Sequence, residues 1–307
     1  MMRASVWIPA LGAALLLGSA VPPRAAAATG LAFLKNGVDA RAVTLGHAVT
    51  ALVDDASASY WNPAGLAAMR RPQLLLSHVE SFGDLRHEYA SVTQPLKGST
   101  TVGLAFNGIW TDNMEGYDEA GNPTGAFGYS AYDALLAAGT AGPWGTRLGA
   151  SFHYLNEAIG SYSASGWAVD LGCQWTWTRS SPFQFGFAVR HLGPAMSFIA
   201  ESFDLPLTIQ GGIAWQKGFS SLGSALTVAA ELRHIRDQGM GLLLGGEYLY
   251  RNLLSFGAGY LGGEDSRGAS LGMGIHHGAL ALHYGYVPVS QEEMGDDEHR
   301  LSLRIDL

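Results

Sequence analysis

The chain has 307 residues, a formal net charge of −8 and only 14% charged residues, together with 41 glycines and 10% aromatic residues. Soluble domains carry about 25% charged residues, and the mean hydropathy of +0.11 is too low for a bundle of apolar membrane helices. The negative charge gives no electrostatic footprint for nucleic acid, and a single cysteine excludes an intramolecular disulfide and a multi-thiolate zinc site. This composition favours a transmembrane β-barrel, in which only alternate residues meet lipid.

Residues 1–28 are predicted to be a cleaved export signal. Arg3 gives a positive start, residues 6–21 form an apolar core, and the four alanines of residues 25–28 supply small residues for cleavage. We expect the mature chain to begin at Ala28 or Thr29. Because a predicted barrel follows this export signal in the chain, we expect the protein to lie in the outer membrane of a diderm bacterium.

Residues 29–71 contain the only stretch after the signal, residues 37–69, that does not read as sheet. Five apolar residues in it have roughly helical spacing: Val43, Leu45, Val49, Leu52 and Val53. Asp54 and Asp55 fall near the end of this predicted helix as candidate anchors for lumen cations, and Asn62-Pro63 then predicts a turn. We expect a partly helical plug at or inside the mouth of the barrel, which either fills the lumen or acts as a movable hatch or binding element.

From residue 72 onward apolar and polar residues alternate, as on strands with one apolar and one polar face. Phe152 and Tyr154, for example, fall on one face and Ser151 and His153 on the other. About fourteen antiparallel strands are predicted: 72–80, 86–95, 99–110, 128–140, 144–157, 163–179, 181–193, 206–217, 221–236, 239–250, 252–263, 266–276, 278–288 and 298–307. An even number of strands is typical of bacterial barrels, and longer connections are expected at 111–127, 193–205 and 289–298.

A large soluble β-sandwich is the alternative fold. Against it, the polar positions hold mostly Gly, Ser, Thr and Gln with scattered single charges, whereas a solvated sheet face would be rich in Lys and Glu. Aromatic residues also gather near strand ends, where a barrel carries its interfacial girdles: Trp110, Trp144, Trp175, Trp177, Tyr248, Tyr250, Tyr284 and Tyr286. We therefore predict an all-β fold, a transmembrane barrel formed by residues 72–307.

Few residues suggest chemistry. Residues 257–262 match the GxGxxG pattern, but they lie inside a predicted strand rather than at the start of a helix, so close packing explains them better than a dinucleotide. Seven charged or ionisable residues are expected to face the lumen: Arg147, His153, Glu157, Asp170, Arg190, Glu247 and Arg251. Structural pairing of these charges is favoured over a substrate relay, and we expect no enzyme active site and no cofactor.

Four motifs follow one another along the predicted mature chain. The first comprises Gly37, Ala40-Arg41-Ala42, Gly46, Ala48, Asp54-Asp55 and Trp61-Asn62-Pro63-Ala64-Gly65; the others are Leu205-Pro206-Leu207-Thr208, Gly245-Gly246-Glu247-Tyr248 with Asn252-Leu253 and Gly259-Tyr260, and His299-Arg300-Leu301-Ser302-Leu303. Together they resemble the PorV/PorQ family of outer-membrane proteins, a branch of the long-chain fatty-acid transporter barrels. Leu307 departs from the family's usual terminal Phe.

This resemblance implies a fourteen-stranded barrel whose lumen is plugged by the N-terminal segment, with nine motif residues marking the plug: Arg41, Gly46, Asp54, Asp55, Trp61, Asn62, Pro63, Ala64 and Gly65. It also implies one of two non-enzymatic roles. The first is a protein-interaction component of type IX-like secretion, whose partners are secretion-system proteins or exported cargo. The second is a channel for hydrophobic small molecules. In both roles the barrel is embedded in outer-membrane lipid.

Overall fold

The computed structural model describes residues 29–80, 85–176, 178, 181–198, 201–263, 268–288 and 297–307. The predicted signal, Trp177 and residues 289–296 of the last predicted connection lie outside these ranges. Fourteen described strands form a closed antiparallel barrel: β1 (Gln73–Glu80), β2 (Arg86–Pro95), β3 (Thr100–Tyr117), β4 (Pro123–Ala141), β5 (Thr146–Ile159), β6 (Tyr162–Thr176), β7 (Phe183–Leu192), β10 (Thr208–Phe219), β11 (Ser224–Ile235), β12 (Gly239–Tyr250), β13 (Leu254–Gly262), β14 (Gly268–His277), β15 (Leu280–Val287) and β16 (Glu298–Asp306). The predicted fold is confirmed.

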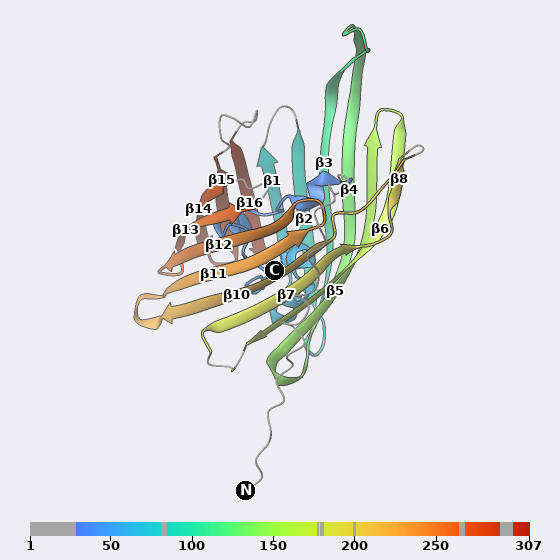
Figure 1. Cartoon of the computed structure of the whole chain (residues 1–307). Coiled ribbons are helices and arrows are strands. Elements are labelled where there is room, and N and C mark those ends of the chain that lie inside the picture. The colour runs from blue at the N-terminus through green and yellow to red at the C-terminus, as the bar shows by residue number, and fades with distance from the viewer. Residues whose placement is uncertain are drawn as a thin grey trace.

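The barrel closes where β16 pairs with β1, from Gln73 opposite Asp306 to Glu80 opposite His299. We call the end that carries the β3–β4 hairpin tip the upper rim and the opposite end the lower rim. Short turns occupy the lower rim, two of them one-turn helices, η4 (Pro143–Gly145) and η5 (Ser220–Leu222). Strands β3 to β6 rise above their neighbours at the upper rim (Figure 1).

The predicted connection at residues 111–127 is wrong. Strands β3 and β4 continue as a paired hairpin up to Tyr117 and Pro123, with a register shift between Thr111 and Met114. The described side chains near the tip are exposed on both faces, since the hairpin projects beyond the rest of the barrel. Strands without a lipid-facing side need no alternation, so the pattern that identified the other strands is missing here. The connection at 193–205 also contains a small hairpin, β8 (Met196–Phe198) paired with β9 (Glu201–Phe203).

The predicted alternation between the two barrel faces is present. Leu104, Phe152 and Leu271 are exposed on the outside, as expected for a face that meets lipid, whereas Asn107 and His153 are fully buried on the inside. Among the aromatic residues predicted at strand ends, Trp144, Trp175, Tyr248 and Tyr250 are exposed on or near the lower rim. Within the described ranges no helix is long and apolar enough to cross a membrane.

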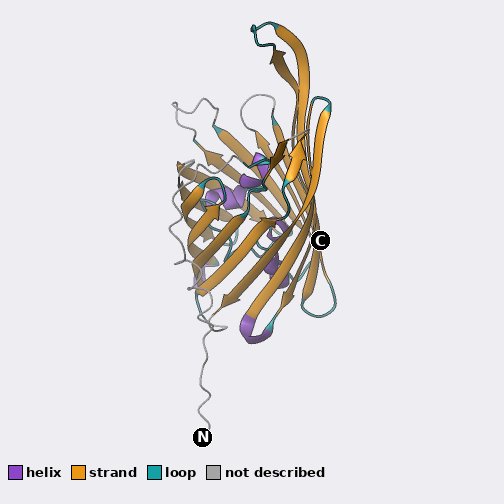
Figure 2. Cartoon of the chain, turned by 45° about the vertical axis from the view of Figure 1, so that its right-hand side comes forward, coloured by secondary structure: helices purple, strands orange, loops and turns teal. Residues whose placement is uncertain are grey.

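The plug, residues 29–71, lies inside the barrel, where its helices are visible between the strands (Figure 2). It contains η2 (Ala32–Lys35), α1 (Ala40–Thr44), α2 (Ala58–Trp61) and η3 (Pro63–Ala68). The continuous helix predicted across residues 43–55 is wrong, because Gly46 and His47 have φ of 57° and 63°. These left-handed residues end α1, and the chain continues through turns rather than a helix.

Glycines on the inner face of the wall make room for the plug. A Cβ on Gly245 of β12 would lie 2.2 Å from the Leu45 carbonyl oxygen, and one on Gly149 of β5 would lie 2.2 Å from the Pro63 carbonyl carbon. The main chain of the plug therefore rests directly on the main chain of the wall. Seven more glycines are in similarly close contact with plug atoms: Gly103, Gly139, Gly172, Gly186, Gly257, Gly259 and Gly272.

Candidate functional site

The corner predicted at Asn62-Pro63 attaches the plug to β6. The Asn62 carboxamide oxygen accepts a hydrogen bond from the Ala64 amide at 3.2 Å, which caps η3 as Pro63 begins it. Its nitrogen donates to the carbonyl oxygens of Thr50 at 2.8 Å and Cys173 at 3.2 Å. One buried side chain thus holds the turn, the preceding plug segment and the wall together.

Three further plug-motif residues also lie at close contacts. Gly46 is packed against the main chains of β12 and β13, and a Cβ on Gly65 would lie 2.2 Å from the Val53 carbonyl oxygen. The indole nitrogen of Trp61 donates to a carboxylate oxygen of Asp39 at 2.7 Å, and Asp39 in turn caps α1. Gly65 and Trp61 thus fix the internal packing of the plug, and Gly46 its close approach to the wall.

The charged plug-motif residues lie toward the lower rim. The guanidinium of Arg41 contacts both carboxylate oxygens of Glu247, with a shortest N–O distance of 3.0 Å. Asp55 faces an arginine of the wall, Arg304, at 3.7 Å, whereas Asp54 is exposed. Asp55 is therefore paired with a side chain of the barrel, and the predicted role of Asp54 and Asp55 as anchors for lumen cations stays a prediction.

Polar side chains of the wall satisfy the main chain of the plug. Gln174 donates to the carbonyl oxygens of Thr50 at 3.1 Å and Val53 at 2.9 Å. Wall residues with the same role are Ser91, Ser151, Gln210, Glu231, Ser270, Arg300 and Ser302. Buried backbone groups need such partners, so these side chains allow a segment with little regular structure to fill the lumen.

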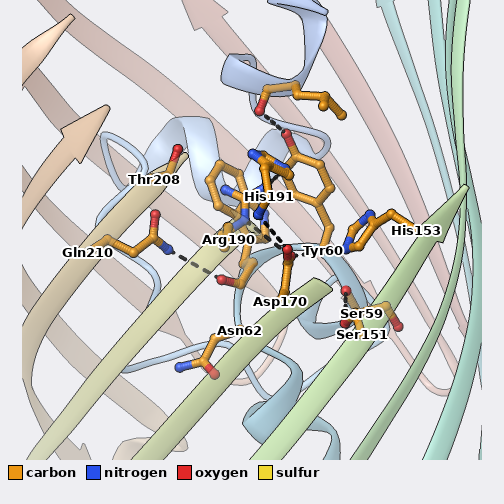
Figure 3. A network of polar contacts seen from close by, with 12 residues as sticks. Ser59, Tyr60, Asn62, Ser151, His153, Asp170, Arg190, His191, Thr208 and Gln210 are labelled. Atoms are coloured by element: carbon orange, nitrogen blue, oxygen red, sulfur yellow. Dashed lines mark hydrogen bonds and ion pairs between the residues drawn. The ribbon is translucent and has the colours of Figure 1, made fainter. Parts of the chain in front are cut away.

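A buried ionic network crosses strands β4 to β7, and Figure 3 shows its members on β5 to β7, His153, Asp170 and Arg190. His153 stands between two carboxylates, with Nδ1 3.0 Å from Asp133 and Nε2 3.1 Å from Asp170. The Nε atom of Arg190 lies 3.7 Å from Asp170, and its guanidinium carbon lies 4.0 Å from the centre of the Tyr60 ring in the plug. A cation over an aromatic face is attracted to it, so the network extends from the wall into the plug.

A β-bulge brings two consecutive residues of β7 into this network. Arg190 and His191 together oppose one residue of β6, Asp170. His191 has φ of 58°, and its amide donates to Asp170 at 2.7 Å. Without the bulge, neighbouring residues would face opposite sides of the wall. Both side chains are instead buried inside the barrel.

The seven predicted lumen residues do not form one network. His153, Asp170 and Arg190 lie together, and Glu247 binds Arg41 of the plug. Arg147 and Glu157 lie near opposite ends of β5, each bonded to a neutral neighbour. The prediction for Arg251 is wrong, because this residue occupies an exposed lower-rim turn with φ of 53°.

Sequence reasoning missed four buried lumen charges, Asp133, Glu231, Glu298 and Arg300, and the partly buried Arg304. Arg300 and Arg304 alternate with Leu301 and Leu303, so the pattern of the last strand could have identified them. Asp133 has apolar or aromatic neighbours on both faces, Ala131 and Leu135 on its own and Tyr132 and Ala134 on the other, and gave no such signal. Within the described residues, no group of three or more His, Cys, Asp or Glu side chains is placed to hold a metal ion.

The upper end of the lumen is apolar. A buried cluster, which we call the upper apolar cluster, joins the start of the plug, the inner faces of β3 to β6 and the segment around β8. Its members are Leu31, Phe33, Leu34, Ile109, Ala131, Leu155, Ala164, Ala168, Met196 and Leu205, with Phe198 and Phe203 packed against it. Barrel interiors are ordinarily polar, and this cluster is the apolar part of the lumen nearest the upper rim.

No family model and no curated protein matches the chain in sequence. Among solved structures, it is similar to the Pseudomonas putida toluene transporter TodX, with a TM-score of 0.64, 12% identity, and coverage of 88% of this chain and 97% of that one. The CymD monoaromatic hydrocarbon channel gives a TM-score of 0.62 at 14% identity, covering 91% and 99%. A Pseudomonas aeruginosa FadL homologue gives 0.56 at 12% identity, covering 88% and 98%.

At these identities the likeness shows the fold. It agrees with the barrel fold that the broader resemblance found in the sequence, to fatty-acid transporter barrels, implies. The narrower resemblance to PorV/PorQ proteins stays a prediction.

Proposed function

We propose that this protein is a non-enzymatic outer-membrane channel for small hydrophobic molecules. The observation that carries the proposal is the upper apolar cluster, which lies at the upper end of a lumen whose other buried wall residues are largely polar. A second apolar cluster packs the body of the plug against the wall below it. The shared fold with a toluene transporter and a monoaromatic hydrocarbon channel supports the same class of ligand. Of the two roles implied by the sequence, the secretion-associated one gains no support from these comparisons.

The ligand class follows from the energetics of burial. Each buried methylene-sized group contributes about 0.8 kcal/mol when it leaves water for an apolar site. A small hydrocarbon would gain this free energy against the upper apolar cluster without leaving any polar group unpaired. A sugar or an ion would lose its hydrogen bonds to water there and find few replacements.

The orientation of the barrel in the outer membrane follows from the lengths of the connections at its two rims. Barrels of the outer membrane place short turns in the periplasm and longer connections outside the cell. The upper rim, with its tall β3–β4 hairpin, would therefore face outward (Figure 1). A hydrophobic molecule arriving from outside would reach the upper apolar cluster, which includes the start of the plug, before the rest of the plug.

Uptake tests the proposal directly. Cells expressing the protein should accumulate radiolabelled toluene faster than cells carrying an empty vector. Met196→Glu, which places a charge in the upper apolar cluster, should remove the difference. Ser197→Glu is the matched control, because Ser197 is the next residue of β8 and is exposed. Equal uptake with and without the protein, or equal uptake by the two variants, would contradict the proposal.

A further inference from the structure

One carboxylate at the upper rim collects several hydrogen bonds from the start of the plug. Asp237 lies in the turn between β11 and β12, and its Oδ2 atom accepts three of them. They come from the Thr29 main-chain nitrogen at 2.9 Å, the Thr29 hydroxyl at 2.7 Å and the Lys35 ammonium at 2.5 Å. The Asp237 side chain is only 7% exposed.

The other carboxylate oxygen of Asp237, Oδ1, is buried and has no hydrogen-bond partner. Leaving a buried acceptor unsatisfied costs about 1–3 kcal/mol, and more for a charged group. A peptide nitrogen at Thr29 has a single hydrogen to donate. An α-ammonium group at the same position has three, enough to serve both carboxylate oxygens.

Processing could create this ammonium group. The sequence leaves two starting points for the mature chain, Ala28 and Thr29, because small residues precede both bonds. Only cleavage directly before Thr29 would place the new amino group on the nitrogen that already contacts Asp237. Cleavage before Ala28 would leave that nitrogen in a peptide bond.

We propose that the export signal is removed directly before Thr29 and that Asp237 binds the resulting α-ammonium group. Signal peptidase adds one water across the 28–29 peptide bond. The carboxylate leaves with the signal, and the amine stays on Thr29 and takes up a proton. Asp237 is thus the docking site of the mature N-terminus.

The charges around Asp237 are compatible with a second cation, the α-ammonium group, beside the Lys35 ammonium. Burial alone raises the pKa of the Asp237 carboxyl, but the hydrogen bonds from Lys35 and Thr29 outweigh it and hold that pKa below its ordinary value. The neighbouring Arg236 is paired with Asp204 at 3.0 Å and is exposed. Charge-assisted hydrogen bonds are about twice as strong as neutral ones, so processing would tighten the hold on residues 29–35.

The docked terminus would hold one side of the upper apolar cluster in place. Leu31, Phe33 and Leu34 belong to that cluster and follow Thr29 directly. Gly30, between them, donates its amide to the Asp204 carbonyl oxygen at 3.2 Å. This inference concerns processing and anchoring, and it stands whether or not the channel function is correct.

The position of the new terminus is tested by sequencing and intact mass of the full-length protein purified from membranes. Thr29 should be the first residue. A mature chain that begins at Ala28 or at any other residue would overturn the proposal.

Binding of the α-ammonium is tested by its reactivity. The reagent 2-pyridinecarboxaldehyde labels α-amines and leaves lysines unmodified, so it reports on the terminus alone. Labelling of the native protein should be at least tenfold slower than labelling of the heat-denatured protein. Asp237→Asn should remove most of this protection, whereas Asp204→Asn, at the exposed acidic residue nearby, should retain it. Equal labelling rates in the wild type and Asp237→Asn would overturn the proposal.

A second variant covers the case in which Asp237→Asn does not assemble into a heat-modifiable barrel. Lys35→Met removes the neighbouring cation and keeps the carboxylate, so the α-ammonium should remain bound and the protection should persist. Loss of protection in Lys35→Met would show that the lysine, rather than the terminus, holds this segment.

Discussion

Replacing Gly245 by alanine adds one methyl group where the inner face of β12 touches the plug. The new Cβ would lie 2.2 Å from the Leu45 carbonyl oxygen, and Cβ atoms essentially never come closer than 3.0 Å to another heavy atom. The plug must therefore withdraw by about 0.8 Å, the difference between these two distances. The Leu45 oxygen is main chain and the position of a Cβ is fixed by the main chain, so no side-chain rotation can relieve the contact.

Overpacking of this kind costs about 1–3 kcal/mol. Free-energy changes of this size shift an equilibrium by about 5- to 150-fold. Because β12 keeps its pairing with β11 and β13, the cost should fall on plug docking rather than on barrel assembly. Gly245→Ala should therefore raise the fraction of molecules with a displaced plug by about 5- to 150-fold.

Two assays report on the plug. Limited proteolysis should cut residues 37–69 faster in Gly245→Ala than in the wild type, and liposomes carrying the variant should be more permeable to small hydrophilic solutes. Gly246→Ala is the matched control, since a Cβ there would face outward with its nearest neighbour, the Thr227 carbonyl oxygen, 3.8 Å away. If the two variants are cut and leak equally, the plug does not rest on Gly245 as described.

Three further outcomes are expected. Arg41→Met should lower the temperature of heat modification, because the nearly buried Glu247 loses hydrogen bonds to a charged partner that are worth about 2 kcal/mol. Arg251→Met, at an exposed turn, should leave this temperature unchanged, and equal shifts in the two variants would contradict the prediction. Asn62→Asp keeps the shape but loses the two donated hydrogen bonds, so hydrogen exchange should accelerate in residues 62–68, and unchanged exchange would refute the role given to Asn62. The pKa of Asp237 in the folded protein is lowered from its ordinary 3.8. Asp237 should therefore stabilise residues 29–35 fully above pH 3.8, and this stabilisation should be lost as the pH falls through the lowered pKa. Loss of hydrogen-exchange protection already near pH 6 would contradict this.

The strands were predictable because a barrel wall separates two environments. Residues 252–263 were expected as a strand and β13 spans Leu254–Gly262, since lipid on one side and a crowded lumen on the other impose alternation. The β3–β4 extension carries no such signal, because both of its faces are exposed. The helix expected over residues 43–55 failed for another reason. Its apolar spacing was roughly helical, but Gly46 and His47 adopt left-handed conformations that no helix accepts.

The sequence could predict which residues face the lumen at the ionic network, but it could not predict which of them pair with one another. Alternation indicated that His153, Asp170 and Arg190 face inward, yet partners across strands depend on register, which alternation alone does not give. The bulge at Arg190 and His191 shifts the register of β7 by one residue and brings both side chains inside. Arg251 shows the reverse error, since a turn residue next to a strand end has no fixed face.

The path of the plug has a consequence for the order of assembly. Its first residues dock at the upper rim through Asp237, whereas its last residues run into β1 at the lower rim. Its hydrogen-bond partners lie on strands all around the barrel, including Ser151 of β5, Gln210 of β10 and Ser302 of β16. If the seam between β16 and β1 closed first, the whole segment would have to be threaded lengthwise through a crowded lumen. An order of assembly in which the sheet curls around the plug and the seam forms last avoids this threading.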